Sequence, residues 1–348
     1  SHPDLDLVGL WVHSDDKAGR DAGEICGGEP VGVIATQGVD DLCRMLASGI
    51  NVVNTSFVPL LYPAAAGPGV LDRLGVGYER MREVNPGIVY CAISGYGQDG
   101  PMRDRSGHDM NYLGLIGLLG LTGEADGPPV QAAGQIADIG GGALMAAFGI
   151  LAALRERDRS GEGQFVDVSM TDGALSWLGM VAGTFLAGGE EPRRGHLPLA
   201  GSFVCYRPYA ASDGWVTLGA LEPKFWRNWC LGVEREDLIE RQFEAPGTPM
   251  HDEVKAIFAT RTREEWHQFA SRHDCCLEPM LELHEALDSE LVQAREMVVE
   301  LDQPGATRPV RLLGAPVKLS RTPADTNRLP GPGLGEHTDA VLRGAGYD

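Results

Sequence analysis

The chain has 348 residues, of which 22% are charged and 43% hydrophobic, which is typical of a soluble globular protein with room for two domains. Its 29 basic and 49 acidic residues give a formal net charge of −20, which argues against nucleic acid or an anionic membrane as a partner. We find no apolar run of membrane-spanning length, no signal peptide and no CxxC pair among the seven cysteines. We therefore expect a protein of the reducing cytoplasm, with no membrane partner and no metal site.

The first 67 residues are expected to form part of a parallel α/β sheet. Leu5–His13, Val31–Ala35 and Ile50–Asn54 are rich in strand-forming residues, and Asp40–Ser48 suits a helix between the last two. The stretches LVGLWVHSDDKAGRDAGEICG, CRMLASGINVVNTS and PLLYP resemble the N-terminal domain of dihydrodipicolinate-reductase-like dehydrogenases. In that family a GxGxxG turn holds the dinucleotide pyrophosphate, and that turn is not among these residues. We expect this segment to serve as scaffold and to bind no NAD(P).

From residue 68 onward, predicted helices and strands alternate. A helix is expected to end at Asn85-Pro86-Gly87, which is a plausible stop signal, and Ile88–Ile93 is typical of a buried strand. The glycine-rich loop Ser94–Pro101 follows that strand. Such a loop often brings backbone N–H groups close to a ligand, although surface turns have the same composition.

Two titratable groups follow, each beside glycines. Gly107-His108-Asp109 precedes an apolar helical stretch through Leu119, and a histidine in this place is often only a cap. Asp138 precedes Gly140-Gly141-Gly142 and the amphipathic run Ala143–Arg157, so it lies at or near a helix N-terminus, where a carboxylate is favoured. Each glycine costs a helix roughly 1 kcal/mol relative to alanine. We therefore expect another backbone or a ligand to approach that turn closely.

The second half changes in character near residue 200. Phe203–Tyr206 and Trp215–Leu218 flank Ala211-Ser212-Asp213-Gly214, which is typical of a hairpin. Glu222-Pro223 follows the second strand, and the glutamate has the place of a first-turn residue beside a proline at N1. The remaining expected elements are a strand at Phe165–Met170, helices at Thr171–Leu186, Arg261–Ala270 and Pro279–Asp288, a strand at Pro316–Leu319, and a terminal helix opening at Leu334–Thr338.

Taken together, these features resemble the family III CoA-transferases of the CaiB/BaiF type, which include formyl-CoA transferase and α-methylacyl-CoA racemase. The matching stretches, in consistent order, are PGVLDRLGVGYERMREVNPGIVYCAISGYGQDGP, GHDMNY, ADIGGGALMAAFGILAALRERDRSGEGQFVDVSM, GALEP and LGEHTDAVL. The resemblance implies an α/β fold with a Rossmann-like parallel-sheet CoA domain and a second, smaller α/β domain. We expect a dehydrogenase-like fragment at 1–67, the large domain at 68–199, the small domain at 200–290, and a return to the large domain at 291–348. The family's interlocked homodimer is also expected.

The resemblance extends to the site. The GHDxNY and GAxEP words are similar to the racemase branch, in which a histidine and an aspartate transfer protons and a glutamate supports the histidine. These positions are His108, Asp138 and Glu222. The residues expected to bind the acyl-CoA substrate are Arg73, Gly107, Asp109, Met110, Asn111, Tyr112, Gly140 and Gly141. No cofactor is expected beyond the CoA moiety of the substrate.

The chemistry suits these residue types. A proton α to a thioester carbonyl is weakly acidic, so its removal needs a placed base, and inversion needs one group on each face. Histidine exchanges protons near neutral pH, and a carboxylate can be its partner if desolvation raises the carboxyl pKa. We therefore predict a racemase or epimerase of 2-methylacyl-CoA thioesters, with His108 and Asp138 on opposite faces and Glu222 holding the imidazole tautomer.

Three alternatives stay open. A CoA-transferase acting between carboxylic acids would use Asp138 as a nucleophile and form an aspartyl-CoA thioester. An inactive hybrid would result if residues 1–67 fail to replace the first strands of the family's CoA-binding sheet; Gly67 stands where the family normally has an arginine. An NAD(P)-dependent reductase would need a dinucleotide site in that same segment.

Overall fold

The structure is a computed structural model, and it describes residues 77–303, 305–324, 331–332 and 336–344. The expectations for residues 1–67 and for Arg73 lie outside the described residues. The chain divides into two units, one formed by residues 1–106, 143–169 and 287–348 and the other by residues 107–142 and 170–286. The domain boundaries expected at 199 and 290 stay predictions.

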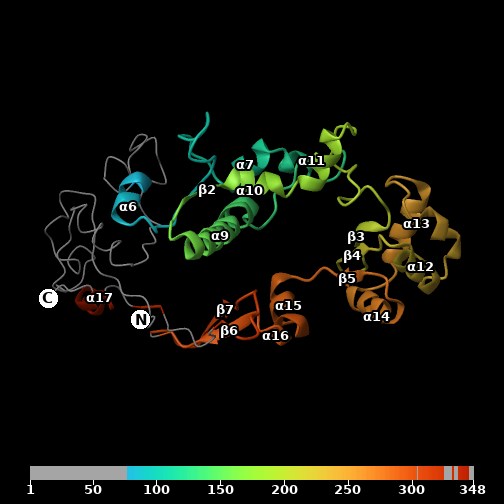
Figure 1. The fold of residues 1–348 in the computed structure, drawn as a ribbon. Coiled ribbons are helices and arrows are strands. Elements are labelled where there is room, and N and C mark those ends of the chain that lie inside the picture. The colour runs from blue at the N-terminus through green and yellow to red at the C-terminus, as the bar shows by residue number, and fades with distance from the viewer. Residues whose placement is uncertain (1–76, 304, 325–330, 333–335, 345–348) are drawn as a thin grey trace. The chain divides into compact units, whose positions relative to one another are not determined.

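The first unit contains a parallel pair of strands covered by a helix (Figure 1). Strand β1 (Tyr90–Ser94) pairs with β2 (Phe165–Ser169) in parallel, and α9 (Leu144–Ser160) packs against both. Helix α6 (Tyr78–Val84) precedes them and ends before the predicted Asn-Pro-Gly stop. Parallel strands need a long crossover, which helices supply, so this pairing confirms the α/β class.

The later part of the first unit corrects one expected strand. Strands β6 (Val298–Leu301) and β7 (Val310–Leu313) form an antiparallel pair, and the stretch expected as a strand, Pro316–Leu319, is irregular. Pro316 has no N–H to donate to a ladder, and the backbone groups of β6 and β7 already hydrogen-bond to each other. Helices α16 (Glu290–Ala294) and α17 (Thr338–Gly344) complete the described elements of this unit.

The second unit begins with short helices. They are α7 (Asp109–Leu115), α8 (Leu118–Leu121), the π-helix η1 (Ile136–Ala143), α10 (Met170–Ser176) and α11 (Gly179–Leu186). Helices α7 and α10 lie side by side (Figure 1). The single helix expected at Thr171–Leu186 is interrupted, because Trp177 and Leu178 donate to carbonyls three residues back and close a tight turn between α10 and α11.

An antiparallel sheet with helices around it forms the rest of the second unit (Figure 1). Strand β4 (Trp215–Gly219) lies between β3 (Tyr206–Ala210) and β5 (Leu277–Pro279). The predicted hairpin is confirmed, but β3 begins where the expected strand Phe203–Tyr206 ends. Ala211 N–H donates to Gly214 O, which pairs Ala210 with Trp215 and sets the register. The helices are α12 (Pro223–Gly232), the 3₁₀ helix η2 (Glu236–Arg241), α13 (Pro249–Phe258), α14 (Arg263–His273) and α15 (Leu283–Asp288).

An aromatic core joins this sheet to its helices. Trp226, Trp229 and Trp266 are fully buried, and the rings of Trp226 and Trp229 stack with centroids 5.0 Å apart. The indole N–H of Trp226 donates to Leu238 O at 3.0 Å, so burial leaves that donor satisfied. A core of this kind holds the start of α12 in a fixed position, and Glu222 is the residue from which α12 begins.

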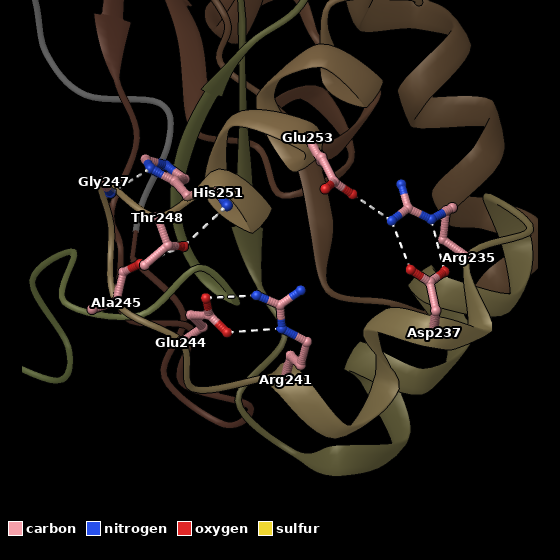
Figure 2. Close-up of polar contacts among 9 residues, drawn as sticks. All are labelled: Arg235, Asp237, Arg241, Glu244, Ala245, Gly247, Thr248, His251 and Glu253. Atoms are coloured by element: carbon pink, nitrogen blue, oxygen red, sulfur yellow. Dashed lines mark hydrogen bonds and ion pairs between the residues drawn. The ribbon is translucent and has the colours of Figure 1, made fainter.

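A polar corner lies beside this core (Figure 2). Arg235 donates to Asp237 and to Glu253, which links η2 to α13. Arg241 forms a bidentate ion pair with Glu244. Nearby, Gly247 N–H donates to the Nδ1 atom of His251 at 3.0 Å. The corner ties the loop between the two helices to both of them.

The helical run Ile136–Ser160 is, among the described residues, long and apolar enough to cross a membrane. The sequence-based statement that no run reaches this length is therefore wrong. The core helix of a soluble protein meets the same criteria, and α9 packs against β1 and β2, so one such helix is weak ground for a membrane protein. The absence of a membrane partner stays a prediction.

Candidate active site

His108 immediately precedes helix α7, in an extended backbone conformation, and its side chain is exposed. Two hydrogen bonds fix the surrounding chain. The His108 N–H donates to Asn111 Oδ1 at 3.0 Å, and the Tyr112 hydroxyl donates to Gly107 O at 2.5 Å. The backbone is thus held by Asn111 and Tyr112, and the imidazole stays at the surface of the unit, where a substrate can reach it.

Asp138 is the third residue of η1 and is half-buried. Its own N–H donates to Asp109 Oδ1 at 3.1 Å, which places it close to the start of α7. Burial raises the pKa of the Asp138 carboxyl, the negative charge of Asp109 raises it further, and His108 opposes both. The structure therefore brings His108 near enough for its charge to act on the Asp138 carboxyl, although the two lie 30 positions apart in the sequence.

The three glycines of η1 allow a close approach by α10. A Cβ on Gly141 would lie 2.6 Å from Met170 O and 2.7 Å from Ala174 N, and a Cβ on Gly140 would lie 2.7 Å from the Trp177 ring. The expected close approach to this turn is confirmed, and a helix backbone makes it. Contact between Gly140 or Gly141 and a CoA substrate stays a prediction.

The other residues of the GHDMNY stretch differ in exposure. Met110 and Asn111 are exposed, whereas Asp109 and Tyr112 are buried. The Asp109 side chain turns toward η1 and accepts hydrogen bonds from Ala137 and Asp138. Its part in organising the site could not be found from the sequence, because its hydrogen-bond partners lie 28 and 29 residues away.

Glu222 is exposed at the N-terminus of α12, and its carbonyl accepts from Phe225 N–H and Trp226 N–H. No hydrogen bond or ion pair joins it to His108 or Asp138 within the residues that the structure describes. Its charge acts on Cys276, whose thiol pKa is raised chiefly by burial and next by Glu222. The expected support of the imidazole by Glu222 stays a prediction.

No group of three His, Cys, Asp or Glu side chains in the described ranges gathers closely enough to bind a metal ion. The chemistry that the arrangement offers is proton transfer or nucleophilic attack. It consists of an exposed imidazole whose charge acts on a half-buried carboxyl, and the pKa of that carboxyl lies above its ordinary value.

Comparison with known proteins identifies the family of the chain. The sequence profile described as CoA-transferase family III matches residues 64–338. The chain is 36% identical to "Alpha-methylacyl-CoA racemase" of Mus musculus over 80% of this chain and 73% of that protein. It is 28% identical to "Succinyl-CoA:glutarate CoA-transferase" of Homo sapiens over 79% of this chain and 64% of that protein.

A solved structure supports the fold. A CaiB/BaiF family protein from Brucella suis superposes with a TM-score of 0.70, at 24% sequence identity, over 88% of this chain and 78% of its own. The fold is therefore the α/β fold of the CaiB/BaiF family proteins. The chain belongs to CoA-transferase family III, in which its relatives include both racemases and transferases.

Proposed function

We propose that the protein is a racemase or epimerase of 2-methylacyl-CoA thioesters. The observation that carries this proposal is that the charge of His108 acts on the Asp138 carboxyl, whose pKa is raised by burial and by Asp109. A two-base reaction needs one group that is free of a proton and one that holds a proton. A carboxyl with a raised pKa is suited to hold it. The likeness to racemases at 32–36% identity supports the same assignment.

The proposed reaction moves one proton off the substrate and one proton onto it. One of the two groups removes the α-proton, and the electron pair of the C–H bond moves into the thioester to form an enolate. The other group then delivers its proton to the opposite face of the α-carbon. The enzyme is left with its single proton on the group that acted as base, and proton exchange with solvent restores the starting state. Glu222 is proposed to hold the imidazole in the tautomer that this exchange requires.

CoA transfer between carboxylic acids is the second candidate, because relatives named as transferases share the same region of the chain. In that reaction the Asp138 carboxylate attacks the acyl-CoA carbonyl and releases CoA thiolate, which leaves a mixed anhydride. The thiolate then attacks the aspartyl carbonyl of the anhydride and releases the first acid, which leaves an aspartyl-CoA thioester. An acceptor carboxylate repeats the two steps in reverse. Both candidates thus depend on Asp138, but only transfer makes a covalent bond to it.

Deuterium incorporation separates the two. In deuterated water, 2-methylacyl-CoA should gain deuterium at the α-carbon without any acid co-substrate, and His108→Ala and Asp138→Ala should each lower that rate by at least about 100-fold. Asp126→Asn, at an exposed loop position, is a matched control that should leave the rate unchanged. A strict requirement for an acceptor acid, together with an adduct at Asp138 that hydroxylamine traps, would instead establish transfer. Absence of both activities would favour the inactive hybrid.

The remaining parts of the proposal concern the setting of the enzyme. We propose that the acyl-CoA is its substrate, with no further cofactor, and that the active form is a homodimer in the cytoplasm. Size-exclusion chromatography with light scattering would measure the oligomeric state. A mass equal to that of one 37.2 kDa chain would contradict the homodimer.

A further inference from the structure

Asp109 is the most deeply buried acidic group around the site. Its side chain accepts a hydrogen bond from Ala137 N–H at 2.6 Å and another from Asp138 N–H at 3.1 Å, both at Oδ1. The first N–H groups of a helix have no partner within the helix. Asp109 therefore caps the start of η1 from a position 28 residues earlier in the sequence.

One of these two bonds begins at the backbone of Asp138 itself. The carboxylate of Asp109 thus restrains the peptide from which the Asp138 side chain extends. Because Asp109 is also the first residue of α7, and His108 directly precedes it, the same residue fixes the separation between the histidine and the aspartate. A proton-transfer pair needs this precision, since small displacements of a catalytic group lower the rate strongly.

We infer that Asp109 is a positioning residue of the active site: it holds the backbone of Asp138 and places a fixed negative charge beside that carboxyl. The inference deepens the proposed racemase function and rests on it. Of the two effects of Asp109, the hydrogen bonds set where the Asp138 carboxyl lies, and the charge favours the form of that carboxyl that carries a proton.

The other groups around Asp138 do not duplicate this charge. His108 acts in the opposite direction and lowers the pKa of the carboxyl. On α7 the Tyr112 hydroxyl donates to Gly107 O. On α10, which packs against the glycines of η1, the acidic residue is Asp172, and its side chain is exposed. Asp109 is therefore the charge whose removal should change the protonation of Asp138 most.

Two substitutions in the full chain separate the effects of Asp109. Asp109→Asn keeps a side-chain oxygen that can accept the two N–H bonds but removes the charge, whereas Asp109→Ala removes both. We expect the deuterium-incorporation rate to fall about tenfold in Asp109→Asn and about 100-fold in Asp109→Ala. The alkaline limb of the kcat/KM profile, where Asp138 loses the proton that it must give, should move to lower pH in Asp109→Asn, because the pKa of Asp138 falls when the neighbouring negative charge is lost. Asp126→Asn, which removes one charge from an exposed position, should change neither the deuterium-incorporation rate nor the pH profile.

A readout without turnover keeps the inference separate from the proposed function. In protein labelled with ¹³C at aspartate carboxyls, the Asp138 resonance, assigned by its loss in Asp138→Asn, should titrate at lower pH in Asp109→Asn than in the wild type. The amide proton shifts of Ala137 and Asp138 should change in Asp109→Ala. An Asp138 titration that is the same in Asp109→Asn and the wild type would overturn the inference. If Asp109→Asn shifts the titration of Asp138 but the wild-type chain incorporates no deuterium, the positioning role stands and the racemase is refuted.

Discussion

His251 makes the stability of the small sheet and its helices depend on pH. The residue is 3% exposed, its Nδ1 accepts from Gly247 N–H, and its ring contacts Tyr209 edge to face. An Nδ1 atom that accepts a hydrogen bond carries no proton, so the folded state holds the imidazole neutral. Burial, followed by the positive charges of Arg207 and Lys255, lowers the pKa of His251 to about 4.

The sign and size of the effect follow from this pKa. The unfolded chain takes up a proton at His251 near its ordinary pKa of 6.5, and the folded chain does so only near 4. Unfolding is therefore favoured as the pH falls below 6.5, and the stability that the neutral His251 contributes is fully lost below about pH 4. From pH 7.5 to pH 5 the free energy of unfolding should decrease by at most about 2 kcal/mol from this group alone. Carboxylates with lowered pKa values, such as Glu285, reduce the free energy of unfolding mainly at lower pH.

The test compares His251→Asn with the wild type. Asparagine offers an oxygen near the Nδ1 position that can accept from Gly247 N–H, and it does not titrate. Urea unfolding followed by tryptophan fluorescence at pH 7.5, 6.5, 5.8 and 5.0 reports on this core, where Trp226, Trp229 and Trp266 are buried. His251→Asn should be less stable at pH 7.5 and should lose much less stability toward pH 5. The exposed His267, replaced by asparagine, is the control. Equal pH dependence in the wild type and His251→Asn would refute the reasoning.

Three further predictions concern the helices, the site and the first segment. Gly141→Ala should destabilise the protein by about 1–3 kcal/mol in urea unfolding, because its Cβ would collide with the backbone of α10, whereas Gly179→Ala, in open space, should be neutral or stabilising. Glu222→Gln should lower the deuterium-incorporation rate about tenfold without changing the unfolding midpoint if Glu222 supports His108; an unchanged rate would remove that role. Titration of NADPH, followed by nicotinamide fluorescence, should show no saturable binding, and tight binding would restore the reductase alternative.

Local signals predicted the parts of the fold that depend on neighbouring residues. The turn Ala211–Gly214 and the start of α12 at Glu222-Pro223 follow from residues within a few positions of each other. The strand expected at Pro316–Leu319 failed because pairing is decided by a partner elsewhere, and Val298–Leu301 pairs with Val310–Leu313 instead. The break between α10 and α11 has a local origin instead, since Trp177 and Leu178 close a turn that periodicity alone does not show.

The same distinction applies to the site. The sequence placed Asp138 beside glycines near a helix start, and the structure adds that the helix is a π-helix capped by a carboxylate from α7. This contact bears on the choice between the two proposed reactions. A nucleophilic aspartate must be ionised, whereas burial and the charge of Asp109 both shift Asp138 toward its protonated form. This direction is the one that the racemase proposal requires of an acid that gives its proton to an enolate, and His108 opposes it. The deuterium and hydroxylamine experiments therefore decide between racemisation and transfer.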